Sequence, residues 1–309
     1  MSKSKTTLDV ILATLRQREG TRLTANELSA KMVEENPEWA EKKRSKSRNP
    51  AIRDGGFEEL RAHVQSEIGS HRTRIENHET LRMTEDRPRR YYYSKLSDSE
   101  ELEAVETSTD LGGQSASISE HDLYPLLAGF LRNEHGVYTR RIDERKSRNT
   151  QGSGGNRWLH PDLIGFEVVS ERWSETIQQL VHSRSDPSSR LWSFEVKKLI
   201  NRANLREVFF QTLSNSAWAN LAYLVTREIT GKGTLDELRI LSSQHGVGLI
   251  QLDADFPEES VFLIQAEERA EVDWTAANRL SEENPDAEAV FRQVRVYHQA
   301  GELTKEFWD

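Results

Sequence analysis

Two short apolar segments between residues 159 and 198 constrain this chain most, because each has the pattern of a buried β-strand. The first covers residues 162–169 and the second residues 191–197. Side chains alternate between the two faces of a strand, so Glu195 and Lys197 are expected on one face and the apolar residues between them on the other. A carboxylate and an ammonium group two residues apart on a buried strand indicate a chemical role.

These strands predict a metal-dependent nuclease site. Asp162 stands at the start of the first strand and meets Glu195 if the two strands are neighbours. A metal ion on two carboxylates lowers the pKa of bound water and neutralises phosphate charge, as phosphodiester hydrolysis requires. The carbonyl oxygen of Val196 is expected as a further ligand, and Lys197 would stabilise the charge on the phosphate. Lys198 faces the other way and has no expected catalytic role. An ordinary salt bridge between Glu195 and Lys197 is the alternative that the pattern leaves open.

The absence of cysteine decides which metal is expected. Without thiolates, a metal ion must be held by carboxylates, histidines or backbone oxygens, which favours Mg²⁺ or Mn²⁺. A chain without cysteine also fits a reducing cytoplasm. Since no apolar stretch approaches the roughly 18 residues of a membrane span, we expect a soluble cytoplasmic protein that does not bind membranes.

The charge is unevenly distributed along the chain. The net charge is −9, but residues 1–95 contain 20 Lys and Arg against 15 Asp and Glu, whereas the remainder contains 22 against 36. The first part therefore has a balance of +5 and the rest a balance of −14. We expect contacts with nucleic-acid phosphates in the basic first part.

Residues 1–96 have the element order of a winged helix-turn-helix domain, with three helical patterns followed by a small hairpin. The helices are expected at 7–18, after a capping box of Thr24 and Glu27, and at 57–68, with extended pieces around 72–75 and 90–94. Exposed basic residues are also common on solvated surfaces, which is the alternative for this region. The candidate DNA-binding residues are Lys42, Lys43, Arg44, Lys46, Arg48, Arg53, Arg72, Arg74, Arg89 and Arg90.

An acidic linker is expected at 97–116, followed by an α/β domain at 117–309. A helix at 117–133, capped by Ser117 or Ser119, precedes three strands, and a helix, a strand, a second helix and a last strand follow. This order predicts a compact domain with a mixed central sheet. Residues 172–181 are expected to be a short helical or extended piece, and two C-terminal helices complete the chain.

The second domain resembles the PD-(D/E)XK, or restriction endonuclease-like, superfamily. Pro161-Asp162 and Glu195-Val196-Lys197 match its motif, and the core order of helix, three strands, helix and strand is similar. The resemblance implies a further acid on the first helix, for which Glu120 is the candidate and Glu167 the second choice. It also implies a glutamine on the helix after the lysine strand, where Gln211 stands.

The N-terminal part is similar to a HARE-HTH winged helix, and the whole arrangement resembles HrgA-type proteins. This implies a restriction or genome-defence nuclease that binds double-stranded DNA, with modified bases as one kind of target. Cutting both strands often needs two active sites, so a homodimer is one expected assembly. A DNA-binding regulator with an inactive nuclease-like domain is the main alternative. Nucleases that act on RNA or on branched DNA are a further one.

Overall fold

The computed structural model divides into two compact units. One comprises Met1–Glu103 with Ile229–Thr234, and the other comprises Ala104–Glu228 with Leu235–Asp309. The structure describes residues 5–47, 49–107, 118–148, 150, 152, 156, 158–184, 189–301 and 303–309. Within these ranges, no helix combines the length and the apolar character that crossing a membrane requires.

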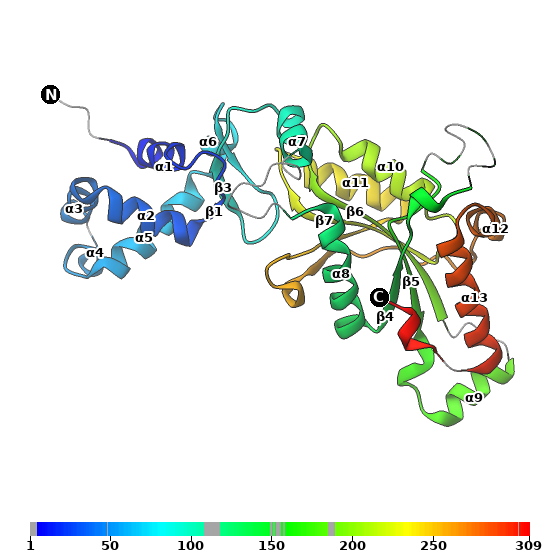
Figure 1. The fold of residues 1–309 in the computed structure, drawn as a ribbon. Coiled ribbons are helices and arrows are strands. Elements are labelled where there is room, and N and C mark those ends of the chain that lie inside the picture. The colour runs from blue at the N-terminus through cyan, green and yellow to red at the C-terminus, as the bar shows by residue number, and fades with distance from the viewer. Residues whose placement is uncertain are drawn as a thin grey trace. The chain divides into compact units, whose positions relative to one another are not determined.

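The N-terminal unit consists of helices and a small antiparallel sheet of three strands (Figure 1). Its elements are α1 (Thr7–Arg16), β1 (Leu23–Thr24), α2 (Ala25–Glu35), α3 (Pro37–Ser45), α4 (Pro50–Arg53), α5 (Phe57–Ser70), α6 (Arg72–Glu76), β2 (Leu81–Met83) and β3 (Arg90–Tyr93). The sheet order is β1-β3-β2.

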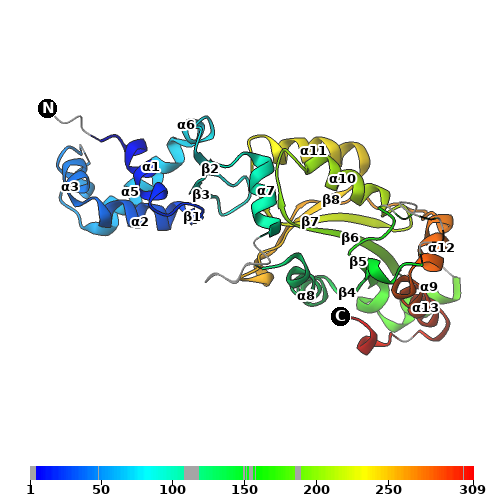
Figure 2. The same cartoon turned by 45° about the horizontal axis from the view of Figure 1, so that its top comes forward.

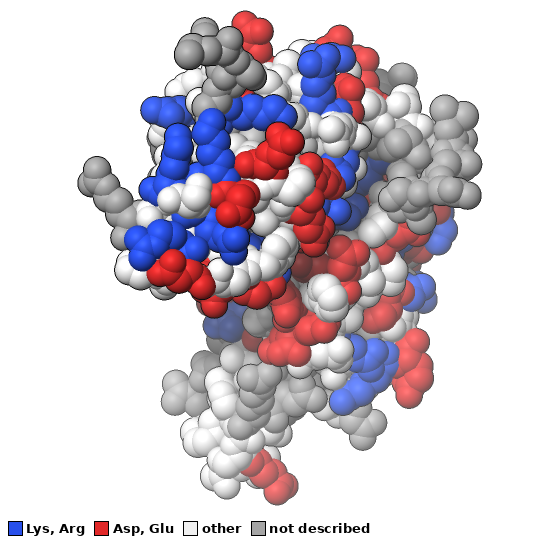
Figure 3. All heavy atoms as spheres, turned by 90° about the vertical axis from the view of Figure 1, so that its left-hand side faces the viewer, with Lys and Arg blue, Asp and Glu red and all other residues white. Residues whose placement is uncertain are grey.

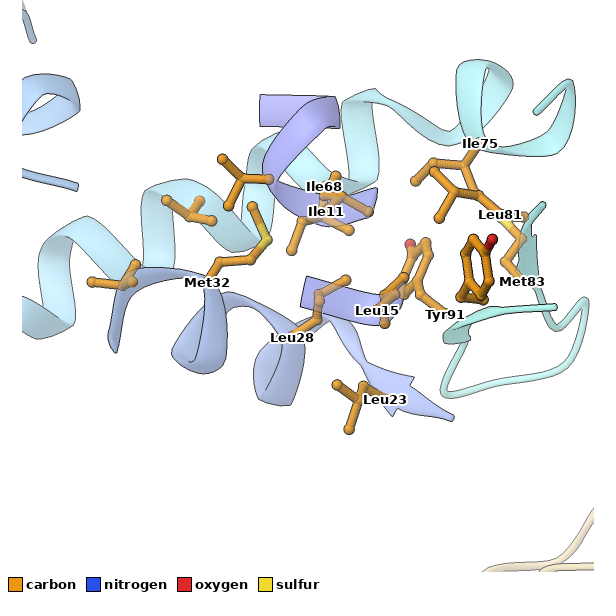
Figure 4. Close-up of a cluster of buried hydrophobic side chains, with 14 of the residues drawn as sticks. Ile11, Leu15, Leu23, Leu28, Met32, Ile68, Ile75, Leu81, Met83 and Tyr91 are labelled. Atoms are coloured by element: carbon orange, nitrogen blue, oxygen red, sulfur yellow. The ribbon is translucent and has the colours of Figure 1, made fainter. Parts of the chain in front are cut away.

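Local sequence explains where the first helices begin. The predicted capping box of α2 is present, since the side chain of Thr24 accepts from the backbone of Glu27 and Glu27 accepts from the backbone of Thr24. Thr6 and Asp9 form the same arrangement at α1. One continuous apolar core joins these helices to α5 and the small sheet, and Figure 4 shows Ile11 and Met32 within it.

One prediction for the N-terminal unit needs correction, and one of its strands was not predicted. The segment 72–75, expected to be extended, is helical and belongs to α6, and the strand that pairs with β3 is instead β2. A hydrogen bond from the backbone of Ile75 to the carbonyl of His71 continues the helix, and Arg72 and Glu76 form an ion pair one turn apart. The strand β1, which the sequence did not predict, pairs with β3.

The basic run 41–53 also contains helices, α3 and α4. Helix α3 buries only Ala40, so its sequence carries no apolar stripe that would reveal the helix. The predicted linker begins with a helix as well, α7 (Asp98–Thr107), in which half of the residues are acidic and most are exposed. Residues 108–117 lie outside the described part of the chain, and so does Ser117, one of the two predicted caps.

The C-terminal unit has a mixed sheet of six strands in the order β4-β5-β6-β7-β8-β9, with helices on both faces. Its strands are β4 (Val137–Arg141), β5 (Leu163–Val168), β6 (Ser189–Ile200), β7 (Leu221–Ile229), β8 (Gly248–Gln251) and β9 (Val261–Ile264). Its helices are α8 (Glu120–Phe130), continued by a π-turn (Leu131–His135), α9 (Glu175–Arg184), α10 (Leu205–Ser214), α11 (Thr234–His245), α12 (Trp274–Glu283) and α13 (Pro285–Ala300), with 3₁₀ turns at Glu144–Lys146, Val169–Arg172, Pro257–Glu259 and Lys305–Phe307. The mixed α/β architecture is as predicted.

Strand alternation divides the core of this unit between the two faces of the sheet. Val137 and Phe194 pack with α8 on one face, whereas Tyr138 and Phe166 pack with α12 and α13 on the other. Figure 2 shows α8 on one side of the sheet and α10 and α11 on the opposite side. The two faces of β6 therefore meet different helices, which determines what its polar side chains contact.

Gly165 allows β5 and β6 to approach each other closely at the centre of the sheet. A Cβ atom at this position would lie 2.9 Å from both the Phe194 ring and the Cβ of Trp192. These two aromatic rings stack with centroids 5.9 Å apart, and any larger residue at 165 would displace them. Gly165 thus positions β6 close against β5, and with it the polar residues that follow Phe194.

The sequence did not predict β9. Its residues are exposed or half-buried, so the strand has no clear apolar face. It pairs antiparallel with β8 at the end of the sheet that is remote from β4. Segment 172–181, whose type was left open, is mainly helical and forms part of α9.

Candidate active site

Asp162 lies at the start of β5, where its backbone joins two neighbouring strands. Its amide donates to the carbonyl of Phe194 at 3.0 Å, and its carbonyl accepts from Ile142 at 2.9 Å. The side chain accepts a hydrogen bond of 2.7 Å from the backbone amide of Val196 at Oδ2. The side-chain carboxylate of Asp162 therefore accepts from the Val196 amide, which in a continuing ladder would donate to a backbone carbonyl of the neighbouring strand. This bond holds the carboxylate beside the centre of β6.

Glu195 is on the opposite face of β6 from Phe194 and is 1% exposed. Its carboxylate oxygens accept hydrogen bonds from a side chain of α10, from the C-cap residue of that helix and from Lys197, two positions further along β6. Gln211 donates to Oε1 at 2.6 Å, and Asn215 donates to Oε2 at 2.7 Å. Hydrogen bonds to a charged group contribute roughly 1.5–3 kcal/mol each, so these amides offset much of the cost of burying a carboxylate.

Lys197 joins Glu195 to the first helix of the unit. Its ammonium donates to Oε1 of Glu195 at 2.6 Å and lies 3.8 Å from Oε1 of Glu120 on α8. Its side chain is 20% exposed and that of Glu120 is 34% exposed, so this side of the cluster opens to solvent. A phosphate group can approach Lys197 from there.

Tyr124 on α8 contacts two of the acids in the cluster. Its hydroxyl donates to Oδ1 of Asp162 at 3.1 Å and lies 3.5 Å from Oε1 of Glu120. Tyr124 and Glu120 are four residues apart on one helix and therefore share a face. The four elements that supply the cluster are α8, the start of β5, β6 and α10.

The electrostatics of the cluster are those of two buried carboxylates beside one ammonium group. Burial and the charge of Asp162 raise the pKa of Glu195 to about 8, although Lys197 and Asn215 counteract the rise. Burial also raises the pKa of Asp162, and burial together with Asp162 raises the pKa of Glu120. Burial opposes the charge of Lys197, but the three carboxylates outweigh it and raise the pKa of Lys197. Lys197 is thus positively charged at neutral pH, whereas Glu195 gains or loses its proton at a pH close to neutral.

The cluster offers a metal ion hard oxygen ligands from two carboxylates. Within the ranges that the structure describes, no three or more side chains of His, Asp or Glu gather as a ready metal-binding group. A metal ion here would therefore depend on Asp162, Glu195 and a backbone oxygen, as predicted for the carbonyl of Val196. Its donor set suits Mg²⁺ or Mn²⁺, and a cation would relieve the repulsion that raises the pKa of Glu195.

The structure brings Asp162, Glu195, Lys197, Glu120 and Gln211 together but leaves Glu167 elsewhere. Glu167 accepts from the indole of Trp192 at 3.1 Å and lies 3.5 Å from Arg190. It stands five residues along the chain from Asp162, and none of its described contacts reaches the cluster. The ammonium group of Lys198 donates to the carbonyl of Val105 instead of Glu195.

Sequence reasoning missed Tyr124 and Asn215. Each stands four residues after a predicted residue, Tyr124 after Glu120 within α8 and Asn215, the C-cap of α10, after Gln211. Helical spacing places such residues on one face, which is the signal that would have found them. The amide of Asn215 is 1% exposed and also donates to the carbonyl of His160 at 3.3 Å.

The predicted DNA-binding residues divide into paired and unpaired cations. Lys43 pairs with Glu67, Arg44 with Glu41, Arg53 with Asp54 and Arg72 with Glu76. Lys42, Lys46, Arg74, Arg89 and Arg90 form no ion pair within the described ranges. Arg48 lies outside them.

Lys42 and Lys46 are exposed, stand one helical turn apart, and line a hollow of about 340 Å³ with Lys5, Lys43 and Trp39. Figure 3 looks towards the end of the N-terminal unit that carries α3 and α4 and shows Lys and Arg side chains gathered there. This surface is the strongest candidate within the unit for contacts with phosphates.

Comparison with known proteins adds no family to this geometry: no family model, no curated protein and no solved structure matches the chain.

Proposed function

We propose that this protein is a metal-dependent DNA endonuclease of the restriction or genome-defence type. The observation that carries the proposal is the meeting of Asp162, Glu195 and Lys197 at one buried centre, with the ammonium group at its solvent-facing side. A structural salt bridge would need only Glu195 and Lys197. It would not need a second buried carboxylate, whose charge raises the pKa of Glu195.

Each side chain has a distinct task in this proposal. Lys197 is kept positively charged by its carboxylate neighbours, and it stabilises the negative charge that develops on phosphate oxygens as water attacks phosphorus. The attacking water gives up a proton to solvent, the P–O bond to the leaving group breaks, and the leaving oxygen takes up a proton from solvent. Gln211 and Asn215 hold Glu195 in one orientation, and Tyr124 and the amide of Val196 do the same for Asp162.

Asp162, Glu195 and the carbonyl oxygen of Val196 would hold Mg²⁺ or Mn²⁺. When bound, such an ion supplies a water of lowered pKa and neutralises phosphate charge. The binding residues must then be ionised. Since burial and Asp162 raise the pKa of Glu195 to about 8, metal affinity should increase as the pH rises towards that value.

The N-terminal unit would bind the DNA duplex in the manner of a winged helix-turn-helix. Helix α5 would be the recognition helix in such a domain, but its first turn carries Glu58 and Glu59, which are exposed and would repel phosphates. Lys42 on α3 and Lys46, the C-cap of that helix, are exposed and better suited to contact the phosphates of the DNA backbone. We therefore assign phosphate contacts mainly to α3, and base recognition to side chains beyond the acidic turn of α5.

A plasmid-nicking assay tests the proposal. Purified protein with Mg²⁺ should convert supercoiled plasmid into open-circular or linear DNA, and parallel digests of unmodified, methylated and hydroxymethylated plasmid should show which substrate is preferred. Asp162→Asn should abolish cutting and preserve binding, because it removes one charge and keeps the side-chain shape. If wild-type protein binds every substrate and cuts none, the DNA-binding regulator is favoured instead.

A further inference from the structure

A pocket of about 430 Å³ lies beside the catalytic cluster in the C-terminal unit. Its volume falls in the range of about 300–1,000 Å³ typical of small-molecule sites. Tyr124 belongs to both places, since its ring lines the pocket and its hydroxyl contacts Asp162. A group bound in the pocket would therefore adjoin the bond that the proposed reaction breaks.

Arg141 differs from the other cations of this pocket because no carboxylate within the described ranges neutralises it. Arg140 pairs with Asp309 at 2.7 Å, and Lys146 pairs with Asp286 at 2.9 Å. The guanidinium of Arg141 instead has Nη2 at 3.2 Å from Nε2 of His121, and Nη1 has no hydrogen-bond partner within the same ranges. A charge left uncompensated at the wall of a pocket is a receptor for an anion.

The position of Arg141 is fixed before any ligand arrives. It is the last residue of β4, opposite Leu163 in the ladder, and its guanidinium lies over the Tyr124 ring at 5.2 Å from the centroid. Its backbone amide donates to Asp309 at 2.7 Å. A planar guanidinium held against an aromatic ring loses little freedom when it binds phosphate, which favours affinity.

The remaining lining suits a nucleotide better than a bare anion. Pro125 lies within α8 and has no N–H group, so the carbonyl of His121 lacks the donor it would otherwise meet one turn later. Asp143 and Asp286 also line the pocket and would repel an isolated phosphate, but they can accept hydrogen bonds from the N–H groups of a base, such as the ring N–H of thymine. The pocket thus combines one phosphate receptor with several acceptors.

We propose that this pocket binds one nucleotide of the DNA substrate, next to the scissile phosphate, with its own phosphate on Arg141. The inference rests on the proposed nuclease function and identifies where the strand continues beyond the cut. Tyr124 would then couple substrate binding to the active site, because its ring supports Arg141 and its hydroxyl holds Asp162.

Isothermal titration calorimetry with a 5′-phosphorylated thymidine dinucleotide tests the proposal on the full chain. EDTA excludes metal, so binding is measured without cleavage. We expect inorganic phosphate and unphosphorylated thymidine each to bind at least tenfold more weakly than the dinucleotide. Arg141→Gln should weaken dinucleotide binding about tenfold, and Arg141→Lys should have an intermediate effect because it keeps the charge but loses the planar fork. Arg239→Gln is the matched control, since Arg239 is an exposed arginine of the same unit outside the pocket, and it should bind as wild type does.

Two results would overturn the proposal: equal dinucleotide affinity in Arg141→Gln and wild type, or equal affinity of inorganic phosphate and dinucleotide. Thermal melts of each variant establish that it is folded, and Arg141→Lys provides the folded comparison if Arg141→Gln melts early. The outcome is independent of cleavage. Loss of binding in Arg141→Gln together with an inactive wild type would support the pocket and refute the nuclease. If the wild type nicks plasmid but Arg141→Gln binds the dinucleotide as tightly as wild type, the nuclease is supported and the pocket is refuted.

Discussion

The hydroxyl of Tyr124 donates a hydrogen bond of 3.1 Å to Oδ1 of Asp162. The other oxygen of Asp162 accepts from the amide of Val196 at 2.7 Å, so both carboxylate oxygens have protein donors. These bonds lower the pKa of Asp162 in opposition to burial, which raises it. A neutral phenol on α8 therefore helps to keep a buried acid ionised.

Replacing Tyr124 by phenylalanine should make DNA cleavage more sensitive to acid. Without the hydroxyl, the pKa of Asp162 rises further, and each unit of that rise lowers the ionised fraction about tenfold below the pKa. We expect Tyr124→Phe to nick plasmid more slowly than wild type at pH 6, with the difference narrowing towards pH 9. Tyr138→Phe is the control, because Tyr138 is a buried tyrosine on the other face of the sheet. An equal loss of rate at every pH would show that the hydroxyl does not act through Asp162.

Glu195 should make the stability of the protein depend on pH. Its pKa is about 8 in the folded state and about 4.5 in the unfolded chain, so the folded state holds the additional proton between these values. The stabilisation from this group is therefore complete below pH 4.5 and is lost as the pH rises towards 8, at about 1.4 kcal/mol per pKa unit. Glu195→Gln resembles the protonated form at every pH. The difference in melting temperature, variant minus wild type, should be more positive at pH 8.5 than at pH 5.

The control for this experiment is Glu258→Gln, which removes an exposed carboxylate from the same unit. Its melting temperature should differ from that of the wild type by the same amount at both pH values. A constant difference for Glu195→Gln as well would mean that Glu195 is ionised throughout the range, and the coupling to Asp162 would be weaker than the geometry indicates.

The cluster around Asp162 and Glu195 was predictable in part because two strand patterns carry it. Alternation along β6 indicates which residues share a face, and the order of elements makes β5 its neighbour, so Asp162, Glu195 and Lys197 follow from periodicity. Tyr124 and Asn215 are different. They are uncharged residues whose role arises only when α8 and α10 dock on the sheet, and in the sequence only their spacing of four residues from Glu120 and Gln211 marks them.

The errors in the fold also have physical causes. Helix α3 buries a single alanine, and β9 has no fully buried residue, so neither element has the apolar periodicity on which prediction depends. The short segment that forms α6 was expected to be extended, as one of two pieces separated by polar turn residues. It is helical because it directly continues α5, where His71 supplies the acceptor for Ile75. The structure of this short segment is thus determined by the helix next to it in the chain.

Lys197 should be necessary for cleavage, and its neighbour Lys198 should not. Lys197→Met removes the ammonium that faces Glu195 and Glu120, and we expect nicking to fall by about 10²–10⁴ with little change in DNA affinity. Lys198→Met removes the same charge one residue later, from the opposite face of β6, and should cut within a few-fold of the wild-type rate. Nicking rates and gel-shift affinities measured side by side separate chemistry from binding. Equal losses in the two variants would point to a general effect of charge near the sheet.

The salt dependence of DNA binding tests the assignment of phosphate contacts to α3. A protein that neutralises phosphates releases counterions, and each contact adds about 0.9 to the slope of log affinity against log salt. Lys42 and Lys46 are exposed and unpaired within the described ranges, so the double variant Lys42→Gln/Lys46→Gln should reduce the magnitude of the slope by about two. Arg239→Gln/Arg292→Gln is the matched control, because it removes two charges from ion pairs of the C-terminal unit. Fluorescence anisotropy with a labelled duplex between 50 and 300 mM salt, roughly the range in which this term dominates, gives both slopes. A wild-type slope in the lysine variant would move the DNA-binding surface away from α3 and towards the unpaired arginines of β3 and α6.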